Sequence, residues 1–99
     1  MMKLLIVDDE PIERDGMQAI LQKAYPRLDI KQAKNGKVAV EVADHFKPDL
    51  IMMDIMMPGM TGLEAVEIIS AKNPTIKSVM VTAFDMFNFP RQAMKLGVK

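Results

Sequence analysis

Cysteine and tryptophan are both absent from this chain of 99 residues. Without cysteine the protein has neither a disulfide framework nor a thiolate zinc site. A net charge is absent as well, because 13 lysines and arginines balance 13 aspartates and glutamates. Surfaces that bind nucleic acids or anionic membranes need an excess of basic residues. The composition therefore predicts that this chain by itself binds neither nucleic acid nor membrane.

Long hydrophobic runs are also missing from the sequence. No run approaches the ~18 apolar residues that predict a transmembrane helix. The first apolar run, residues 4–7, is too short for a signal peptide and ends in acidic residues. Hydrophobic residues nevertheless make up 49% of the chain and charged residues 26%, which is typical of a globular protein. We therefore predict a single domain, residues 1–99, with a cytoplasmic location.

Short apolar runs recur along the chain, and each is followed by a polar residue. The runs are residues 4–7 before Asp8 and Asp9, residues 50–53 before Asp54, and residues 79–81 before Thr82. Uninterrupted apolar runs of this length are typical of parallel strands that are covered on both faces. Residues 29–33 mix apolar and polar side chains, which suits a strand at the edge of a sheet.

Apolar residues at helical spacing lie between these strands. The predicted inward faces are Ile12, Met17, Ile20, Leu21 and Ala24; Val38, Ala39, Val42, Ala43 and Phe46; and Leu63, Val66, Ile68 and Ile69. We predict a fourth helix from about residue 88 or 90 to residue 96. Strands that alternate with helices predict an α/β fold, here a doubly wound parallel sheet with right-handed crossovers and the flavodoxin-like strand order 2-1-3-4.

Acidic residues follow the two strands that are central in this order. Ligands bind at the carboxyl ends of such strands, where the order reverses, so Asp8, Asp9 and Asp54 are expected in one small volume. Carboxylates this close repel one another unless a cation neutralises them, and oxygen ligands favour Mg²⁺. Thr82 offers a hydroxyl to the same pocket, and the small Ala83 leaves space there for a ligand. An aspartate in such a site can accept a phosphoryl group.

Three motifs stand at these strand ends: VDDE at residues 7–10, MDIMMPGMTG at residues 53–62 and VTA at residues 81–83. In order and spacing they resemble the receiver domain of bacterial two-component response regulators, over essentially the whole chain. The surrounding sequences, DDEPIER at residues 8–14 and TAFD at residues 82–85, are most similar to receivers joined to AraC-type helix-turn-helix domains.

The resemblance implies a role for each residue of the site. Asp54 would accept the phosphoryl group from a sensor histidine kinase. Asp9, Asp54 and the backbone carbonyl of Met56 would bind Mg²⁺ directly, and Asp8 would help through a water molecule. Thr82 would hydrogen-bond the phosphoryl group and move with it. The chain would then be a phosphoacceptor rather than an enzyme, losing its phosphoryl group slowly and controlling an attached DNA-binding domain in transcription regulation.

The resemblance also predicts more chain than is present. Receivers continue past residues 97–98 into a fifth strand, which carries an aromatic switch residue and a Lys-Pro pair, and then into a fifth helix. Lys99 falls too early to be the phosphate-binding lysine, so residues 1–99 are expected to be an incomplete receiver. With the order 2-1-3-4 the strand at residues 79–81 is a bare apolar edge. We expect a fifth strand and helix to cover this edge, or a second copy of the chain in a homodimer.

Other interpretations of these residues remain open. Asp8 and Asp9 are also suited to capping the helix that follows them. A phosphorylation-independent interaction module could retain the same fold without the chemistry. A magnesium-dependent phosphatase of the haloacid dehalogenase type needs a second aspartate two residues after its nucleophile. Those positions hold Met56 after Asp54 and Glu10 after Asp8, which disfavours the phosphatase.

Overall fold

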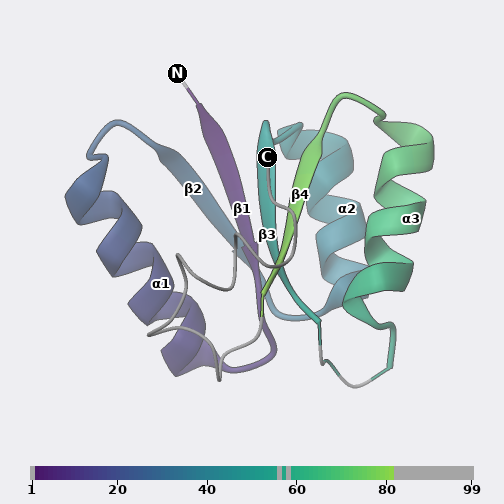
Figure 1. Ribbon diagram of the computed structural model, residues 1–99, viewed down its shortest axis with the longest axis horizontal. Coiled ribbons are helices and arrows are strands. Elements are labelled where there is room, and N and C mark those ends of the chain that lie inside the picture. Colours follow the sequence, from purple (N-terminus) through teal and green to yellow (C-terminus); the bar gives the residue numbers. More distant parts are fainter. Residues whose placement is uncertain (1, 56, 58, 82–99) are drawn as a thin grey trace.

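The computed structural model describes residues 2–55, 57 and 59–81. The elements in this part are β1 (Lys3–Val7), α1 (Pro11–Ala24), β2 (Asp29–Ala33), α2 (Gly36–Phe46), β3 (Leu50–Asp54), α3 (Gly62–Lys72) and β4 (Lys77–Val81). The strands form one parallel sheet in the order β2-β1-β3-β4 (Figure 1). The predicted fold class and strand order are thus confirmed, whereas the predicted fourth helix lies outside the described residues.

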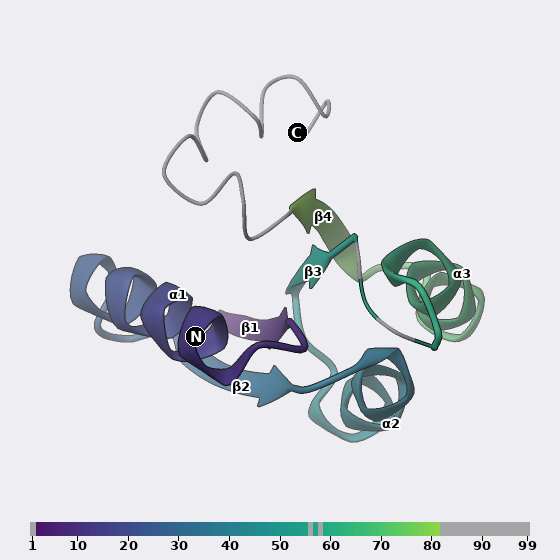
Figure 2. The same cartoon turned by 90° about the horizontal axis from the view of Figure 1, so that it is seen from below.

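The two central strands, β1 and β3, are buried on both faces of the sheet. Figure 2 shows α1 on one face and α2 with α3 on the other. Successive side chains of a strand point to opposite faces, so an uninterrupted apolar run supplies both cores. The core on the α1 side contains Leu4, Ile6, Met17, Met52, Val79 and Val81. The core on the α2 and α3 side contains, among others, Leu5, Val7, Ala39, Ala43, Ile51, Met53, Ala65 and Ile69.

The predicted inward faces of α1 and α3 are partly wrong. Ile12 and Ile20 of α1 are 86% and 62% exposed, and Leu63 and Ile68 of α3 are 59% and 37% exposed. Ala24 of α1 is exposed as well. Helical spacing shows which residues share a face, but the stripe that meets the sheet depends on how closely the backbones approach. Small residues allow the closest approach, and α3 indeed buries Gly62 and Ala65 together with Ile69. The face of α2 is confirmed, with Ala39, Ala43 and Phe46 buried.

Local hydrogen bonds define the first turns of the two helices on this face. The side chain of Asn35 caps α2 by accepting the N–H of Val38 at 2.8 Å. A capping box begins α3: Thr61 Oγ1 accepts the N–H of Glu64 at 3.2 Å, and Glu64 Oε1 accepts the N–H of Thr61 at 2.9 Å. These caps satisfy backbone donors that a helix cannot pair internally.

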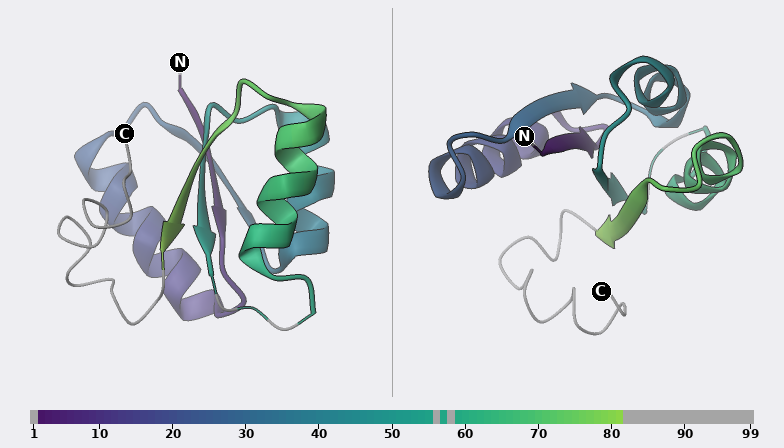
Figure 3. Two further views of the ribbon diagram at one scale, coloured as in Figure 1. Left: turned by 45° about the vertical axis from the view of Figure 1, so that its right-hand side comes forward. Right: turned by 90° about the horizontal axis from the view of Figure 1, so that it is seen from above.

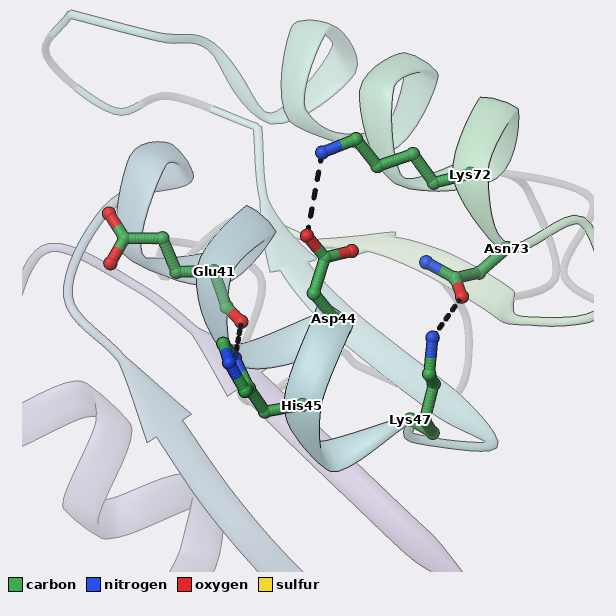
Figure 4. Close-up of polar contacts among 6 residues, drawn as sticks. All are labelled: Glu41, Asp44, His45, Lys47, Lys72 and Asn73. Carbon is green, nitrogen blue, oxygen red and sulfur yellow. Dashed lines mark hydrogen bonds and ion pairs between the residues drawn. The ribbon is translucent and has the colours of Figure 1, made fainter.

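The outer sides of α2 and α3, which run side by side (Figure 3), carry two polar contacts. Lys72 Nζ lies 3.4 Å from Asp44 Oδ2, and Lys47 Nζ donates to Asn73 Oδ1 at 3.0 Å (Figure 4). The Lys72 and Asp44 side chains are 55% and 37% exposed. Exposed pairs of this kind contribute about 0–1 kcal/mol, so apolar packing holds the two helices together.

The amino ends of three strands are joined through one residue, Asp49. Its Oδ2 accepts the backbone N–H of Lys3 at 2.8 Å, and its own N–H donates to the carbonyl of Lys3 at 2.8 Å. Its carbonyl accepts the N–H of Lys77 at 3.1 Å. β1, β3 and β4 are therefore fixed relative to one another at the edge of the sheet opposite their carboxyl ends.

Candidate functional site

The carboxyl ends of β1 and β3 bring three aspartates together. Asp8 and Asp9 directly follow β1, and Asp54 is the last residue of β3. The two strands are neighbours in parallel register, and their arrowheads point to the same edge of the sheet in Figure 3. One carboxylate oxygen from each aspartate lies within 4.8 Å of the others. The predicted convergence of these three side chains is confirmed.

The Asp8 side chain is fully buried, and one of its oxygens has a hydrogen-bond partner while the other has none among the described residues. Oδ1 accepts the N–H of Glu10 at 2.9 Å, whereas Oδ2 is buried and unpartnered. Burial raises the pKa of Asp8 above its usual range; the Glu10 hydrogen bond opposes this, and the negative charge of Asp9 adds to it. A buried carboxylate oxygen without a donor is unfavourable unless a cation or a bound water compensates.

Neither Asp8 nor Asp9 is the N-cap of α1. That position is Glu10, which makes no side-chain capping bond, and Pro11 begins the helix. Arg14 instead connects α1 to the strand, because its Nη1 donates to the backbone carbonyl of Asp8 at 2.7 Å. The capping interpretation therefore leaves the convergence of these carboxylates with Asp54 unexplained.

The backbone of Asp54 is enclosed by α3 and β4. A Cβ atom on Gly62 would lie 2.4 Å from the Asp54 carbonyl oxygen and 2.8 Å from Met80 Cε. Just beyond Asp54, the N–H of Ile55 donates to the carbonyl of Val81 at 2.9 Å. Gly62 is therefore required for the close approach of α3, which supports a role in backbone geometry rather than in phosphate binding.

A fourth carboxylate, that of Glu13, lies beside the aspartates and was not predicted as a site residue. Glu13 is in the first turn of α1, and its Oε2 is buried with no hydrogen-bond partner among the described residues. Burial raises the pKa of Glu13, and the negative charges of Asp8, Glu10 and Asp54 raise it further. Glu13 belongs to the DDEPIER segment, which was singled out in the sequence. The spacing of residues along the chain did not show that Glu13 lies close enough to Asp54 for its charge to act.

Met56, Thr82 and Ala83 lie outside the described residues, so their predicted roles remain predictions. Val81, the residue before Thr82, is the register partner of Asp54 in the pairing of β3 with β4.

The donors that converge here suit a hard divalent cation. All three are carboxylate oxygens, and the buried Asp8 Oδ2 has a free acceptor position. Mg²⁺ prefers oxygen ligands and retains several water molecules, so a site with one or two direct carboxylates and a further acceptor fits it. The three aspartates are therefore consistent with a Mg²⁺ site.

The fold and the acidic site define a class: doubly wound α/β proteins with a carboxylate cluster at the switch point of the sheet. Within that class, the chain belongs to the response regulator receiver domain family, whose model matches residues 4–99. Members of this family are non-enzymatic signalling modules, which excludes the phosphatase interpretation. In the described part of the chain, no helix is long and apolar enough to cross a membrane.

Individual relatives agree with this assignment. The transcriptional regulatory protein YesN of Bacillus subtilis is 38% identical over 100 aligned positions, which cover 100% of this chain and 27% of YesN. The chain spans less than half the length of the first curated relatives it matches.

Solved structures show the same fold. A two-component transcriptional regulator AraC from Clostridium phytofermentans has a TM-score of 0.76 and 31% identity, covering 96% of this chain and 74% of that one. The response regulator TrrA from Thermotoga maritima, solved in complex with Mg²⁺ and BeF, has a TM-score of 0.77 and 33% identity, covering 94% of this chain and 81% of TrrA.

Proposed function

We propose that this receiver accepts a phosphoryl group on Asp54 from a sensor histidine kinase in a reaction that requires Mg²⁺. The observation that supports this most directly is the position of Asp54. Its side chain is 4% exposed at the end of a buried strand, with oxygens of Asp8 and Asp9 within 4.8 Å. Three carboxylates that converge within this distance repel one another when ionised, so a cation site explains the arrangement better than a purely structural role does.

The chemistry is a single displacement at phosphorus. A carboxylate oxygen of Asp54 forms the new P–O bond while the P–N bond of the phosphohistidine breaks, and the leaving imidazole nitrogen takes up a proton. Asp9, Asp54 and the carbonyl of Met56 would hold Mg²⁺ directly, and Asp8 would act through water. When bound, Mg²⁺ neutralises charge on the phosphoryl oxygens. Thr82, beside the small Ala83, would donate its hydroxyl to the phosphoryl group.

The proposed output is transcription regulation through an attached DNA-binding domain of the AraC type. The resemblance of residues 8–14 and 82–85 to such receivers supports it, as do the names of YesN and of the Clostridium regulator.

A cytoplasmic location follows from the proposed kinase partner. The incomplete domain, 1–99, and its coverage by further chain or by a homodimer stay predictions.

The test is phosphorylation of the full-length protein with acetyl phosphate, followed by mapping of the modified residue. Asp54→Asn is expected to abolish labelling, and chelation of Mg²⁺ is expected to prevent it in the wild type. Asp44→Asn is the matched control, because Asp44 lies near the carboxyl end of α2, outside the aspartate cluster, and pairs with Lys72. Normal labelling of Asp54→Asn would refute the assignment. A wild-type protein that labels neither with acetyl phosphate nor with a cognate kinase would indicate a phosphorylation-independent interaction module.

A further inference from the structure

Glu13 has an environment that its place in a helix does not explain. An acidic residue in the first turn of a helix is favoured by the helix dipole, but that effect operates equally well on an exposed side chain. Glu13 Oε2 is instead buried and has no hydrogen-bond partner among the described residues. The same is true of Asp8 Oδ2.

The basic side chain next to Glu13 in the sequence, that of Arg14, does not neutralise Glu13. The guanidinium of Arg14 is used elsewhere: its Nε donates to Gln32 Oε1 at 3.1 Å and its Nη1 to the backbone carbonyl of Asp8 at 2.7 Å. The charges that act on Glu13 are all negative and come from Asp8, Glu10 and Asp54. Asp8 and Glu13 lie close enough to share a proton, and this raises the pKa of Glu13 further while it partly offsets the burial that raises the pKa of Asp8. When both are ionised, their buried oxygens face a cluster of like charge, which is unfavourable unless donors are supplied from outside the protein.

A hydrated divalent cation supplies such donors. Mg²⁺ keeps several of its water molecules when it binds to proteins, and each bound water has two hydrogens to donate. Residues that accept these hydrogens, without touching the metal, orient its ligands and change its affinity.

We propose that Glu13 is a positioning residue for the divalent cation, accepting a hydrogen bond through Oε2 from a metal-bound water that Asp8 Oδ2 also contacts. This inference rests on the proposed function, since it assumes a cation between Asp9 and Asp54. It adds a fourth carboxylate to the site, and this carboxylate comes from α1 rather than from a strand end. The first turn of α1 would then become part of the metal site, and its position would respond to metal binding.

The test compares Glu13→Gln with Glu10→Gln in the full-length protein, by titrating Mg²⁺ and following amide NMR shifts. Each substitution removes one negative charge, but Glu10 is exposed. Glu13→Gln replaces the outer carboxylate by a neutral amide, a weaker acceptor, and is expected to weaken Mg²⁺ binding about 10-fold. The screened charge of Glu10 is expected to change it less than about 2-fold.

Thermal unfolding without metal provides a readout that a merely structural role would not give. Glu13→Gln removes repulsion among buried carboxylates, so the metal-free variant is expected to melt at a higher temperature than the wild type while binding Mg²⁺ more weakly. A structural residue would instead lower the melting temperature and leave the affinity unchanged. Glu13→Asp, which keeps the charge but shortens the side chain, serves as a second variant and is expected to weaken binding as well.

The outcomes separate this inference from the proposed function. If Glu13→Gln and Glu13→Asp bind Mg²⁺ like the wild type while Asp9→Ala binds it weakly, the role of Glu13 is overturned and the metal site stands. If the wild type binds no Mg²⁺ at all, both the metal requirement of the proposed function and the role of Glu13 are wrong.

Discussion

Gly62→Ala tests how closely α3 approaches the proposed phosphoacceptor. The added Cβ would lie 2.4 Å from the carbonyl oxygen of Asp54, far inside van der Waals contact. The obstacle is backbone, which cannot rotate away as the end of a flexible side chain can. Overpacking of this kind typically destabilises by about 1–3 kcal/mol. For a domain of this size each kcal/mol lowers the melting temperature by roughly 4–8 °C. Because the Asp54 backbone must shift, Mg²⁺ affinity is expected to fall too.

Gly16→Ala is the matched control for this experiment. Gly16 lies within α1, and an added Cβ would meet nothing within 4 Å. Alanine is favoured over glycine inside a helix by about 0.5–1 kcal/mol, so this substitution is expected to raise the melting temperature. Denaturant unfolding and Mg²⁺ titration of both variants measure the two effects. The reasoning is refuted if Gly62→Ala is as stable as Gly16→Ala and binds Mg²⁺ like the wild type.

Three further predictions concern the caps and the metal site. Asn35→Ala removes the cap of α2 and is expected to lower the free energy of unfolding by about 1 kcal/mol, measured in urea, whereas Asn35→Asp should retain most of it. Hydrogen bonds from Thr61 lower the pKa of Glu64 below 4.5, so their stabilisation is present above that pH and is lost as the pH falls through the lowered pKa. Thermal melts should therefore show Glu64→Gln less stable than the wild type at neutral pH, with a gap that narrows in acid; a constant gap would contradict this. Asp9→Ala is expected to weaken Mg²⁺ binding and phosphorylation together, and an unchanged Mg²⁺ affinity would show the ligand set to be wrong.

The fold was predictable where one physical requirement determines the residue pattern. Residues 4–7 and 50–53 must face apolar surroundings on both sides of the sheet, and only uninterrupted apolar runs satisfy this. Strand ends in a parallel sheet share one edge, so the convergence of Asp8, Asp9 and Asp54 followed from the same pattern together with the strand order.

The remaining features depend on distances between elements, which spacing along the chain does not contain. Ile12 and Ile20 share the helical spacing of Met17, yet only Met17 reaches the core. The need for glycine at position 62 arises from an oxygen of another element, the carbonyl of Asp54. The environment of Glu13 likewise depends on another element, because burial together with the charges of Asp8 and Asp54 at the strand ends raises its pKa.

The hydrogen bonds of Asp49 have a mechanical consequence. They join the amino ends of β1, β3 and β4, while the repelling carboxylates lie at the opposite ends of β1 and β3. Strand pairing holds β1, β3 and β4 together along their length, and the bonds of Asp49 add to this at the amino ends, whereas the repulsion among the carboxylates acts at the other ends. A change of charge at the carboxyl ends is therefore expected to have its smallest effect at the edge that Asp49 joins. Asp49→Ala would remove one of the three bonds, that between the Lys3 N–H and Oδ2, and would let such a change extend further toward the amino ends of β1 and β3.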